Sequence, residues 1–254
     1  MACEIGAEQI ALLLISKTSD QFLATNKNIQ IKTLPIHSAC SCAHIELLTV
    51  VQTILNRLAS SVLLNQVLVS FNDSNKNLLE CSIESNHLKL VELLLRITDL
   101  FKQPDSNGNL PVHYAARTGT PEIFNLLMEH KLISFESNLN KETPLHIAAD
   151  FNRFSFIKMI MLQEKMLMAK EEEKYVPMIR RLNMKNQTPL QIGLINCNEK
   201  CVEEFSSSDD VDLSVKDENN FSIYHLCVLY SNLESLRYLL NKKSNKFLDP
   251  LFIR

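Results

Sequence analysis

Two stretches of this chain share one ten-residue pattern and begin 33 residues apart. They read LPVHYAARTG at 110–119 and TPLHIAADFN at 143–152. A repeat of this length forms one supersecondary unit, which buries its apolar face only when neighbouring units stack against it. The pattern therefore predicts an array of stacked repeats, in which each repeat contacts only its neighbours.

The same frame recurs four more times in a weaker form: LPIH at 34–37, NLLE at 77–80, TPLQ at 188–191 and SIYH at 222–225. The second residue of each segment, here called the Pro slot, falls at 35, 78, 111, 144, 189 and 223. Successive slots are 43, 33, 33, 45 and 34 residues apart, which places insertions within 53–72 and 162–182. We expect the first insertion to form a longer outer helix and a loop.

The residue types in the frame predict a pair of helices in each repeat. Proline suits the first helical turn, where its missing N–H would have no helical partner, and Thr or Ser before it can cap the helix. The pair of small residues at Ala115–Ala116 and Ala148–Ala149, here called the Ala pair, leaves room for a neighbouring helix to pack closely. The apolar spacing that follows predicts a second, outer helix. Between the helices Asn86, Gly119 and Asn152 tolerate left-handed backbone. A polar turn precedes each slot, most clearly at 105–108.

These residues resemble the ankyrin-repeat family, whose period is about 33 residues, and the resemblance runs from residue 2 to 241. It implies a mainly α fold, a solenoid of helix-turn-helix units joined by short β-hairpin-like turns. We expect a single array over 1–254, with a truncated leading repeat at 1–18 and an outer helix at Gln9–Ile15. Further repeats should start near 28, 72, 105, 138, 183 and 217. Because neither end resembles a polar cap, we expect part of a longer solenoid or an incomplete gene product.

The composition excludes several classes of partner. A net charge of −3 gives no general attraction to phosphate, so we expect no nucleic acid partner. No apolar run approaches the roughly 20 residues that cross a bilayer, so we expect no direct membrane insertion by this chain. The seven cysteines lack the spacing of a disulfide framework, which favours a reducing, cytoplasmic location.

The candidate chemical groups all have structural interpretations. Histidines 37, 113, 146 and 225 share one position of the frame, and the resemblance implies that they hydrogen-bond to backbone between repeats. Cys40 and Cys227 occupy the slots of the small Ala116 and Ala115, where burial is expected. Cys42, on the groove side, is the cysteine to test for reactivity. No residues follow a catalytic or metal-binding signature, so we expect no enzyme, no cofactor and no metal site.

A solenoid of this family binds other proteins on a concave surface of turn tips and inner-helix faces. Carrying the family's contact positions over gives three sets of candidate residues: Ser106, Asn107, Asn109, Arg117 and Thr118; Leu139, Asn140, Glu142, Asp150 and Phe151; and Glu218, Asn219, Phe221, Leu229 and Tyr230. Phe151, Phe221 and Tyr230 carry most weight, because exposed aromatic residues are frequent interface anchors.

Two functions remain open at this point. One is a cytoplasmic, non-catalytic adaptor that binds proteins in this groove. The other is the cytosolic ankyrin portion of a TRPA-type cation channel, since the stretch 108–121 resembles part of such arrays. The second insertion and its flanks carry six of the eight methionines, at 159, 161, 166, 168, 178 and 184. It either packs as a longer outer helix or forms an adaptable docking surface.

Overall fold

The computed structural model describes residues 8–25, 33–42, 47–59, 63–97, 103–168 and 175–244. The chain divides into two compact units, unit 1 (residues 1–134) and unit 2 (residues 135–254), and each is described by itself. The described residues form helices, turns and one isolated bridge between Lys216 and Ser222, but no strand. The prediction of a mainly α repeat fold is confirmed.

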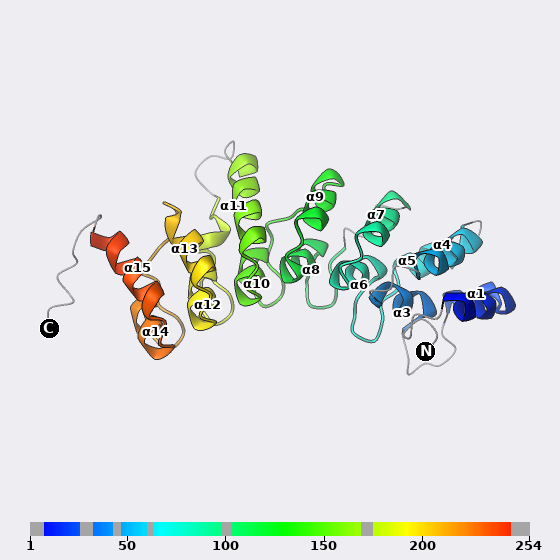
Figure 1. Cartoon of the computed structure of the whole chain (residues 1–254), viewed down its shortest axis with the longest axis horizontal. Helices are drawn as coiled ribbons and strands as arrows, with labels where there is room; N and C mark the ends of the chain where they lie inside the picture. Colours follow the sequence, from blue (N-terminus) through cyan, green and yellow to red (C-terminus); the bar gives the residue numbers. More distant parts are fainter. Residues whose placement is uncertain are drawn as a thin grey trace. The chain divides into compact units, whose positions relative to one another are not determined.

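Unit 1 contains three inner helices, each followed by an outer helix (Figure 1). The inner helices are α3 (Pro35–Ser41), α6 (Leu78–Glu84) and α8 (Pro111–Thr118). The outer helices are α4 (Leu47–Leu58), α7 (Leu88–Ile97) and α9 (Pro121–Glu129). They are preceded by α1 (Glu8–Lys17), which packs on α4 and contains the outer helix expected at Gln9–Ile15. The first seven residues lie outside the described residues.

Unit 2 also contains three inner helices, each followed by an outer helix. Its inner helices are α10 (Pro144–Asp150), α12 (Pro189–Ile195) and α14 (Ile223–Leu229). Its outer helices are α11 (Phe154–Met168), α13 (Glu199–Ser207) and α15 (Leu233–Ser244). Inner helix packs on inner helix, α10 on α12 and α12 on α14, and the outer helices follow the same order. Each inner helix thus has a neighbouring repeat on at least one side.

All six inner helices begin with the same kind of cap. The backbone N–H just before the Pro slot donates to the side chain three residues later. The acceptor is a histidine Nδ1 in four repeats, at 3.0 Å from the Leu110 nitrogen for His113, and a carboxylate or amide oxygen in the others. This bond is half of a capping box, and it satisfies a backbone N–H at the start of the helix. The recurrence explains why one position of the frame favours histidine, glutamine or glutamate.

The turn between the two helices of a repeat uses left-handed backbone, as the frame predicts. Gly119 has a φ of 75°, and Asn86 and Asn152 have φ of 57° and 54°. The equivalent residues of the last two repeats, Cys197 and Ser231, also have positive φ, of 54° and 53°. Neither of these two residue types relieves the steric cost of this conformation, because both carry a Cβ and lack the local amide of asparagine.

The residue after the Pro slot forms the centre of the core. Ile36, Leu79, Val112, Leu145 and Leu190 are all fully buried. The small residues of the Ala pair are buried as well, and so are Cys40 and Cys227, as expected from their slots. Burial in apolar surroundings raises the pKa of the Cys227 thiol to about 11, which leaves it protonated and unreactive at neutral pH.

The first insertion differs from the longer outer helix that we expected. Helix α4 has 12 residues, against 10 in α7, and most of the inserted chain forms a separate helix, α5 (Leu63–Leu68). This helix packs on another short helix that the sequence did not reveal, α2 (Asp20–Ala24). Val67 and Leu68 of α5 are buried, as is Leu23 of α2. Burial against a partner more than 40 residues away therefore decides the structure of this segment.

The second insertion does lengthen an outer helix, since α11 has 15 residues. A short 3-10 helix, η2 (Met178–Arg180), follows it and is held by Glu164 of α11. The Glu164 carboxylate accepts hydrogen bonds from the Met178 backbone N–H (2.7 Å) and the Tyr175 hydroxyl (2.5 Å). Met178 is buried, whereas Met166 and Met184 are exposed. Residues 169–174, which include the Lys-Glu run at 170–174, lie outside the described residues.

Candidate protein-binding surface

The turns that precede the inner helices share one hydrogen-bond pattern. The first residue of each is Asn or Asp, and its side-chain oxygen accepts backbone N–H groups two and four residues later. In unit 2, Asn138 accepts from Asn140 (3.0 Å) and Glu142 (2.9 Å). The turns at 72–76, 105–109, 183–187 and 217–221 repeat this pattern. These bonds use amides that the turn would otherwise leave unsatisfied, so each tip is held in one conformation.

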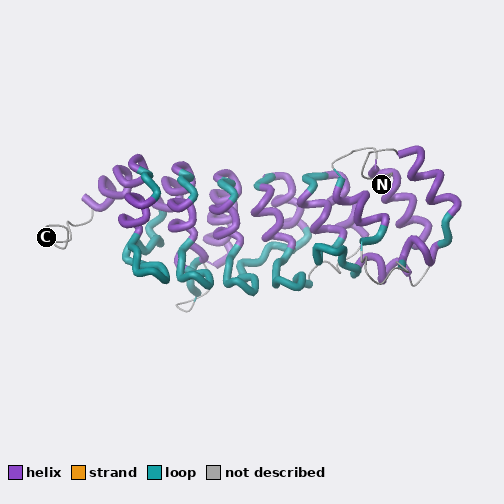
Figure 2. Tube along the Cα trace, turned by 90° about the horizontal axis from the view of Figure 1, so that it is seen from below, coloured by secondary structure: helices purple, strands orange, loops and turns teal. Residues whose placement is uncertain are grey.

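The three tips of unit 2 are also bonded to one another. The Met184 N–H donates to the Asn140 carbonyl at 3.0 Å, and the Glu218 N–H donates to the Lys185 carbonyl at 3.2 Å. Figure 2 shows the loops that join the helix pairs of this unit along one edge. The tips therefore form a continuous, ordered edge within unit 2.

Most of the candidate residues predicted at the tips are exposed. In unit 2 the exposed fraction of Leu139 is 69%, and Asn140, Glu218 and Asn219 are exposed beside it. In unit 1 Ser106 and Asn107 are exposed. These side chains are accessible to a partner, as the family's contact positions require.

Two predicted tip residues instead contribute to the turns themselves. The Asn109 amide donates to the Asp105 carboxylate at 3.1 Å, and the Asn138 amide donates to the Glu142 carboxylate at 3.0 Å. Both Asn109 and Glu142 are half-buried. Their side chains stabilise the tips, so we do not include them among the contact residues proposed below.

The ends of the inner helices in unit 2 place three residues at equivalent positions. They are Phe151 after α10, Asn196 after α12 and Tyr230 after α14, and all three are exposed. Asp150 lies beside this row, and its carboxylate accepts a hydrogen bond from the Asn196 amide at 2.8 Å. The row therefore combines two exposed aromatic rings with a hydrogen-bonded polar pair.

The corresponding residues of unit 1 are more polar. Arg117 is exposed, and its guanidinium lies 3.4 Å from the Glu84 carboxylate. Thr118 is half-buried, and its hydroxyl donates to the Ala115 carbonyl at 3.1 Å. Unit 1 thus offers a charged pair where unit 2 offers aromatic rings.

The middle repeat of unit 2 has exposed residues at the contact positions too, although none of them was predicted from the sequence. Met184, whose exposed fraction is 63%, occupies the same tip position as Leu139, and Lys185 corresponds to Asn140. Asn196 likewise corresponds to Phe151 and Tyr230. The repeat frame could have predicted these positions, because they lie at the same distance from the Pro slot as the contact residues in the neighbouring repeats.

Two of the predicted residues also line a hollow. Leu229 and Phe221 line a hollow of about 470 Å³ beside α14 and α15, together with Val228 and Leu240. All four residues are exposed.

The histidines of the frame have the predicted structural role where a following repeat is described within the same unit. The His37 Nε2 lies 3.2 Å from the Ser70 carbonyl, and the His146 Nε2 lies 3.0 Å from the Gln187 carbonyl. Each Nδ1 accepts the cap hydrogen bond, so Nε2 carries the proton and donates. Burial lowers the pKa of His146 to about 4. These rings are therefore neutral structural donors at neutral pH.

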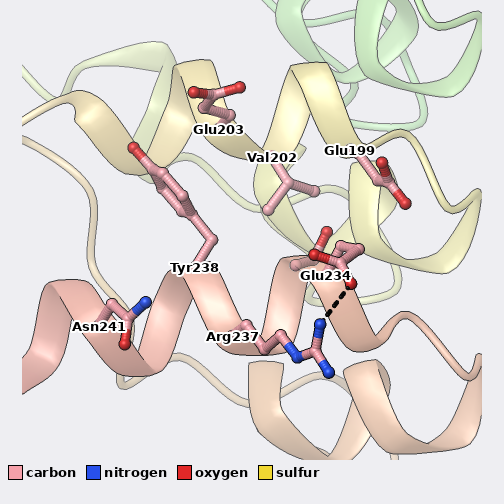
Figure 3. A pocket seen from close by; sticks show the side chains of 8 residues that line it. Glu199, Val202, Glu203, Glu234, Arg237, Tyr238 and Asn241 are labelled. Carbon is pink, nitrogen blue, oxygen red and sulfur yellow. Dashed lines mark hydrogen bonds and ion pairs between the residues drawn. The ribbon is translucent and has the colours of Figure 1, made fainter.

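A second depression lies between the outer helices α13 and α15 and has a volume of about 370 Å³. Figure 3 shows Glu199 and Glu203 on α13, with Tyr238 reaching from α15 toward that helix. On α15 the Arg237 guanidinium donates to the Glu234 carboxylate at 2.8 Å. The lining of this depression carries charges of both signs beside apolar groups. The repeat pattern does not predict it, because outer-helix surface positions follow no repeated pattern.

The described ranges contain no group of three or more His, Cys, Asp or Glu side chains arranged to hold a metal ion. Among the helices of these ranges, none has the length and apolar character that a membrane crossing demands. Cys42, predicted as the cysteine to test, is half-buried. Cys81 and Cys201 are buried, which raises the pKa of each thiol to about 11.

Comparison with known proteins agrees with this architecture. A sequence profile described as ankyrin repeats in three copies matches residues 96–171. The human transient receptor potential cation channel subfamily A member 1 is 22% identical to this chain over 146 residues. That stretch covers 58% of this chain but only 12% of the channel protein. The profile match shows ankyrin repeats over residues 96–171, and the other described helix pairs have the same arrangement.

Proposed function

We propose that this chain is a non-catalytic scaffold that binds a segment of another protein along the tips and inner-helix ends of unit 2. The single observation that supports this most strongly is the recurrence of exposed apolar side chains at equivalent positions in the repeats of unit 2. Leu139 and Met184 recur at neighbouring tips, and Phe151 and Tyr230 recur at the helix ends. Ankyrin repeats commonly serve in protein–protein interaction.

The surroundings of these apolar residues suit a protein ligand. Lys185 and Glu218 lie at the tips, and the Asp150–Asn196 pair lies at the helix ends, so polar groups border the apolar ones. Interfaces typically have this composition, with a few large anchors surrounded by polar contacts. The bonded tips are held in one conformation before a partner arrives, which lowers the entropy cost of binding.

The test uses the whole chain to identify partners by affinity capture and then measures each affinity by calorimetry. We expect Phe151→Ala and Tyr230→Ala each to weaken binding by about 1–2 kcal/mol, roughly a tenfold change in Kd. Leu162→Ala is the control, because Leu162 is an exposed apolar residue on the outer helix α11, away from the tips and inner-helix ends. If both aromatic variants fold, as judged by circular dichroism, and bind like the parent, this surface is not the binding site.

A second candidate function rests on the similarity to the human channel. In that case the chain corresponds to a cytosolic ankyrin portion of a TRPA-type cation channel and is joined to further repeats in a longer polypeptide. Sequencing full-length transcripts tests this directly. Additional repeats and several apolar spans in the same reading frame would support the channel assignment. A transcript that encodes ankyrin repeats alone would contradict it and leave the cytoplasmic adaptor.

A further inference from the structure

The middle tip of unit 2, Met184 and Lys185, lies at the centre of the bonded edge. The Met184 N–H donates to the Asn140 carbonyl at 3.0 Å, and the Lys185 carbonyl accepts the Glu218 N–H at 3.2 Å. The two bonds that join neighbouring tips in the described part of unit 2 both involve this middle tip. Its position therefore affects the whole edge.

The connection that leads into the middle tip is longer than the others. The tips at Asn138 and Asp217 follow soon after Glu129 and Ser207, where α9 and α13 end. Helix α11 ends at Met168, and residues 169–182 separate it from the tip that begins at Asn183. A longer connection has more conformations to lose, so a defined tip requires that the connection is itself held in place.

Glu164 of α11 holds the described part of this connection. Its side chain is buried, and one oxygen, Oε1, accepts both the Met178 N–H and the Tyr175 hydroxyl. A carboxylate oxygen has two lone pairs, so one atom can serve both donors. Helix α11 in turn packs on α10 and α13. The connection is therefore anchored to a helix that is itself fixed within unit 2.

Arg181 holds the same connection close to the tip. Its Nε donates to the Val176 carbonyl at 2.8 Å, and its Nη1 donates to the Phe135 carbonyl at 2.5 Å. Its guanidinium carbon also lies 5.1 Å from the centre of the Tyr175 ring, which is a cation–π distance. One side chain thus bonds both the connection and the segment that leads into the preceding tip at Asn138.

We propose that Glu164 and Arg181 are positioning residues for the binding surface. They hold residues 175–182 in one conformation and thereby fix the middle tip beside its neighbours. The inference rests on the proposed function, because it gives the second insertion a role in partner binding without direct contact. Glu164 is buried and does not touch a partner. Loss of its hydrogen bonds releases Met178, so the tip must be ordered when the partner binds, which weakens binding.

The first measurement is amide hydrogen exchange by NMR on the full chain without a partner. Glu164→Ala should raise the exchange rates of the Met178 and Met184 amides about tenfold or more. Glu164→Gln should exchange like the parent, because its amide oxygen can accept both hydrogen bonds. Lys165→Ala is the matched control, because Lys165 is the next residue on α11 and is exposed. Amides inside α12 should keep the parent rates, which separates release of the connection from unfolding of unit 2.

Two further variants test the remaining contacts. Arg181→Gln should raise the Met184 rate as well, because it removes the forked donor that joins the connection to Phe135. Tyr175→Phe removes only one hydrogen bond and should raise the Met178 and Met184 rates about threefold. This variant decides the question if Glu164→Ala does not fold.

The second measurement is the affinity for the partner that affinity capture with the parent chain identifies. Glu164→Ala should raise Kd about fivefold or more, whereas Glu164→Gln should bind like the parent. A variant that frees Met178 but leaves Met184 at the parent rate would overturn the proposal, and so would a freed Met184 with an unchanged Kd. The exchange measurement needs no partner, so its failure is distinct from failure of the proposed function, which Phe151→Ala and Tyr230→Ala test.

Discussion

Replacing Glu80 with glutamine should stabilise unit 1 at neutral pH. Glu80 is fully buried in α6, at the position that histidine or glutamine occupies in the other repeats. Its Oε2 accepts the Asn77 N–H at 2.8 Å, but its Oε1 has no hydrogen-bond partner among the described residues. Burial raises the pKa of this carboxyl to about 8, and the charge of nearby Asp105 raises it further, against the effects of the Asn77 N–H and Lys76.

The sign of the pH dependence follows from these values. The folded carboxyl has a pKa of about 8 and the unfolded one 4.5, so between these values the folded state holds one proton more. Stability from this group is complete below pH 4.5 and is lost as the pH rises through 8. At pH 7 the loss amounts to about 3 kcal/mol, since each unit of pKa difference is worth about 1.4 kcal/mol. Glutamine carries no charge, so Glu80→Gln removes this loss.

Glutamine should also fit the site, because Gln191 fills the same position in α12. The Gln191 side chain accepts the Thr188 N–H at 2.8 Å and donates to the Val215 carbonyl at 3.2 Å. The cap is therefore kept, and the amide adds a donor where the carboxylate has none. We expect Glu80→Gln to unfold like the parent near pH 4.5 and to be more stable by about 3 kcal/mol at pH 7.

The assay is urea unfolding followed by circular dichroism at several pH values between 4.5 and 8. Other groups titrate in this range, but the difference between the variant and the parent isolates Glu80. Glu92→Gln is the control, because Glu92 is only partly buried and pairs with Arg96 on α7. If parent and Glu80→Gln show the same pH slope, Glu80 is ionised in the folded protein and the reasoning fails.

Three further changes test the frame. Ala148→Asp should destabilise unit 2 by about 3 kcal/mol or more, because Ala148 is fully buried and the carboxylate would have no partner, so unchanged urea unfolding would show a misplaced frame. In thermal unfolding, Ser231→Gly should raise the stability of unit 2 by about 0.5–1 kcal/mol, since the φ of 53° at this position suits glycine. Gly119→Ala should lower the stability of unit 1 in the same measurement, because Gly119 has a φ of 75°. The pKa of His146 is about 4 in the folded state and 6.5 in the unfolded state, so its contribution to stability is complete above pH 6.5 and falls by about 3 kcal/mol toward pH 4. His146→Gln should therefore reduce the loss of stability between pH 6.5 and pH 4 in urea unfolding, and an unchanged loss would contradict the assignment.

Much of the fold follows from local sequence. Three features of the frame predict where each inner helix begins and which of its sides is buried. They are the Pro slot, the cap residue two positions after it, and the pair of small residues that follows. Gly119 and Asn152 predict the left-handed turn, and Asp105 and Asn138 predict the tips. These features depend on hydrogen bonds and steric limits within a few residues, so the chain encodes them wherever the pattern occurs.

Tertiary contacts decided the rest. Leu229 was predicted from its position in the frame as a contact residue, and only the tertiary structure shows that it lines the hollow beside α14. Helix α5 exists because Val67 and Leu68 are buried against α2, a contact between segments that share no repeat pattern. Val228 and Leu194 occupy the same position of the frame, yet one is exposed and the other is buried. The frame predicts which side of a helix is apolar. Whether that side is buried depends on a neighbouring repeat, whose residues lie more than 30 positions away in the sequence.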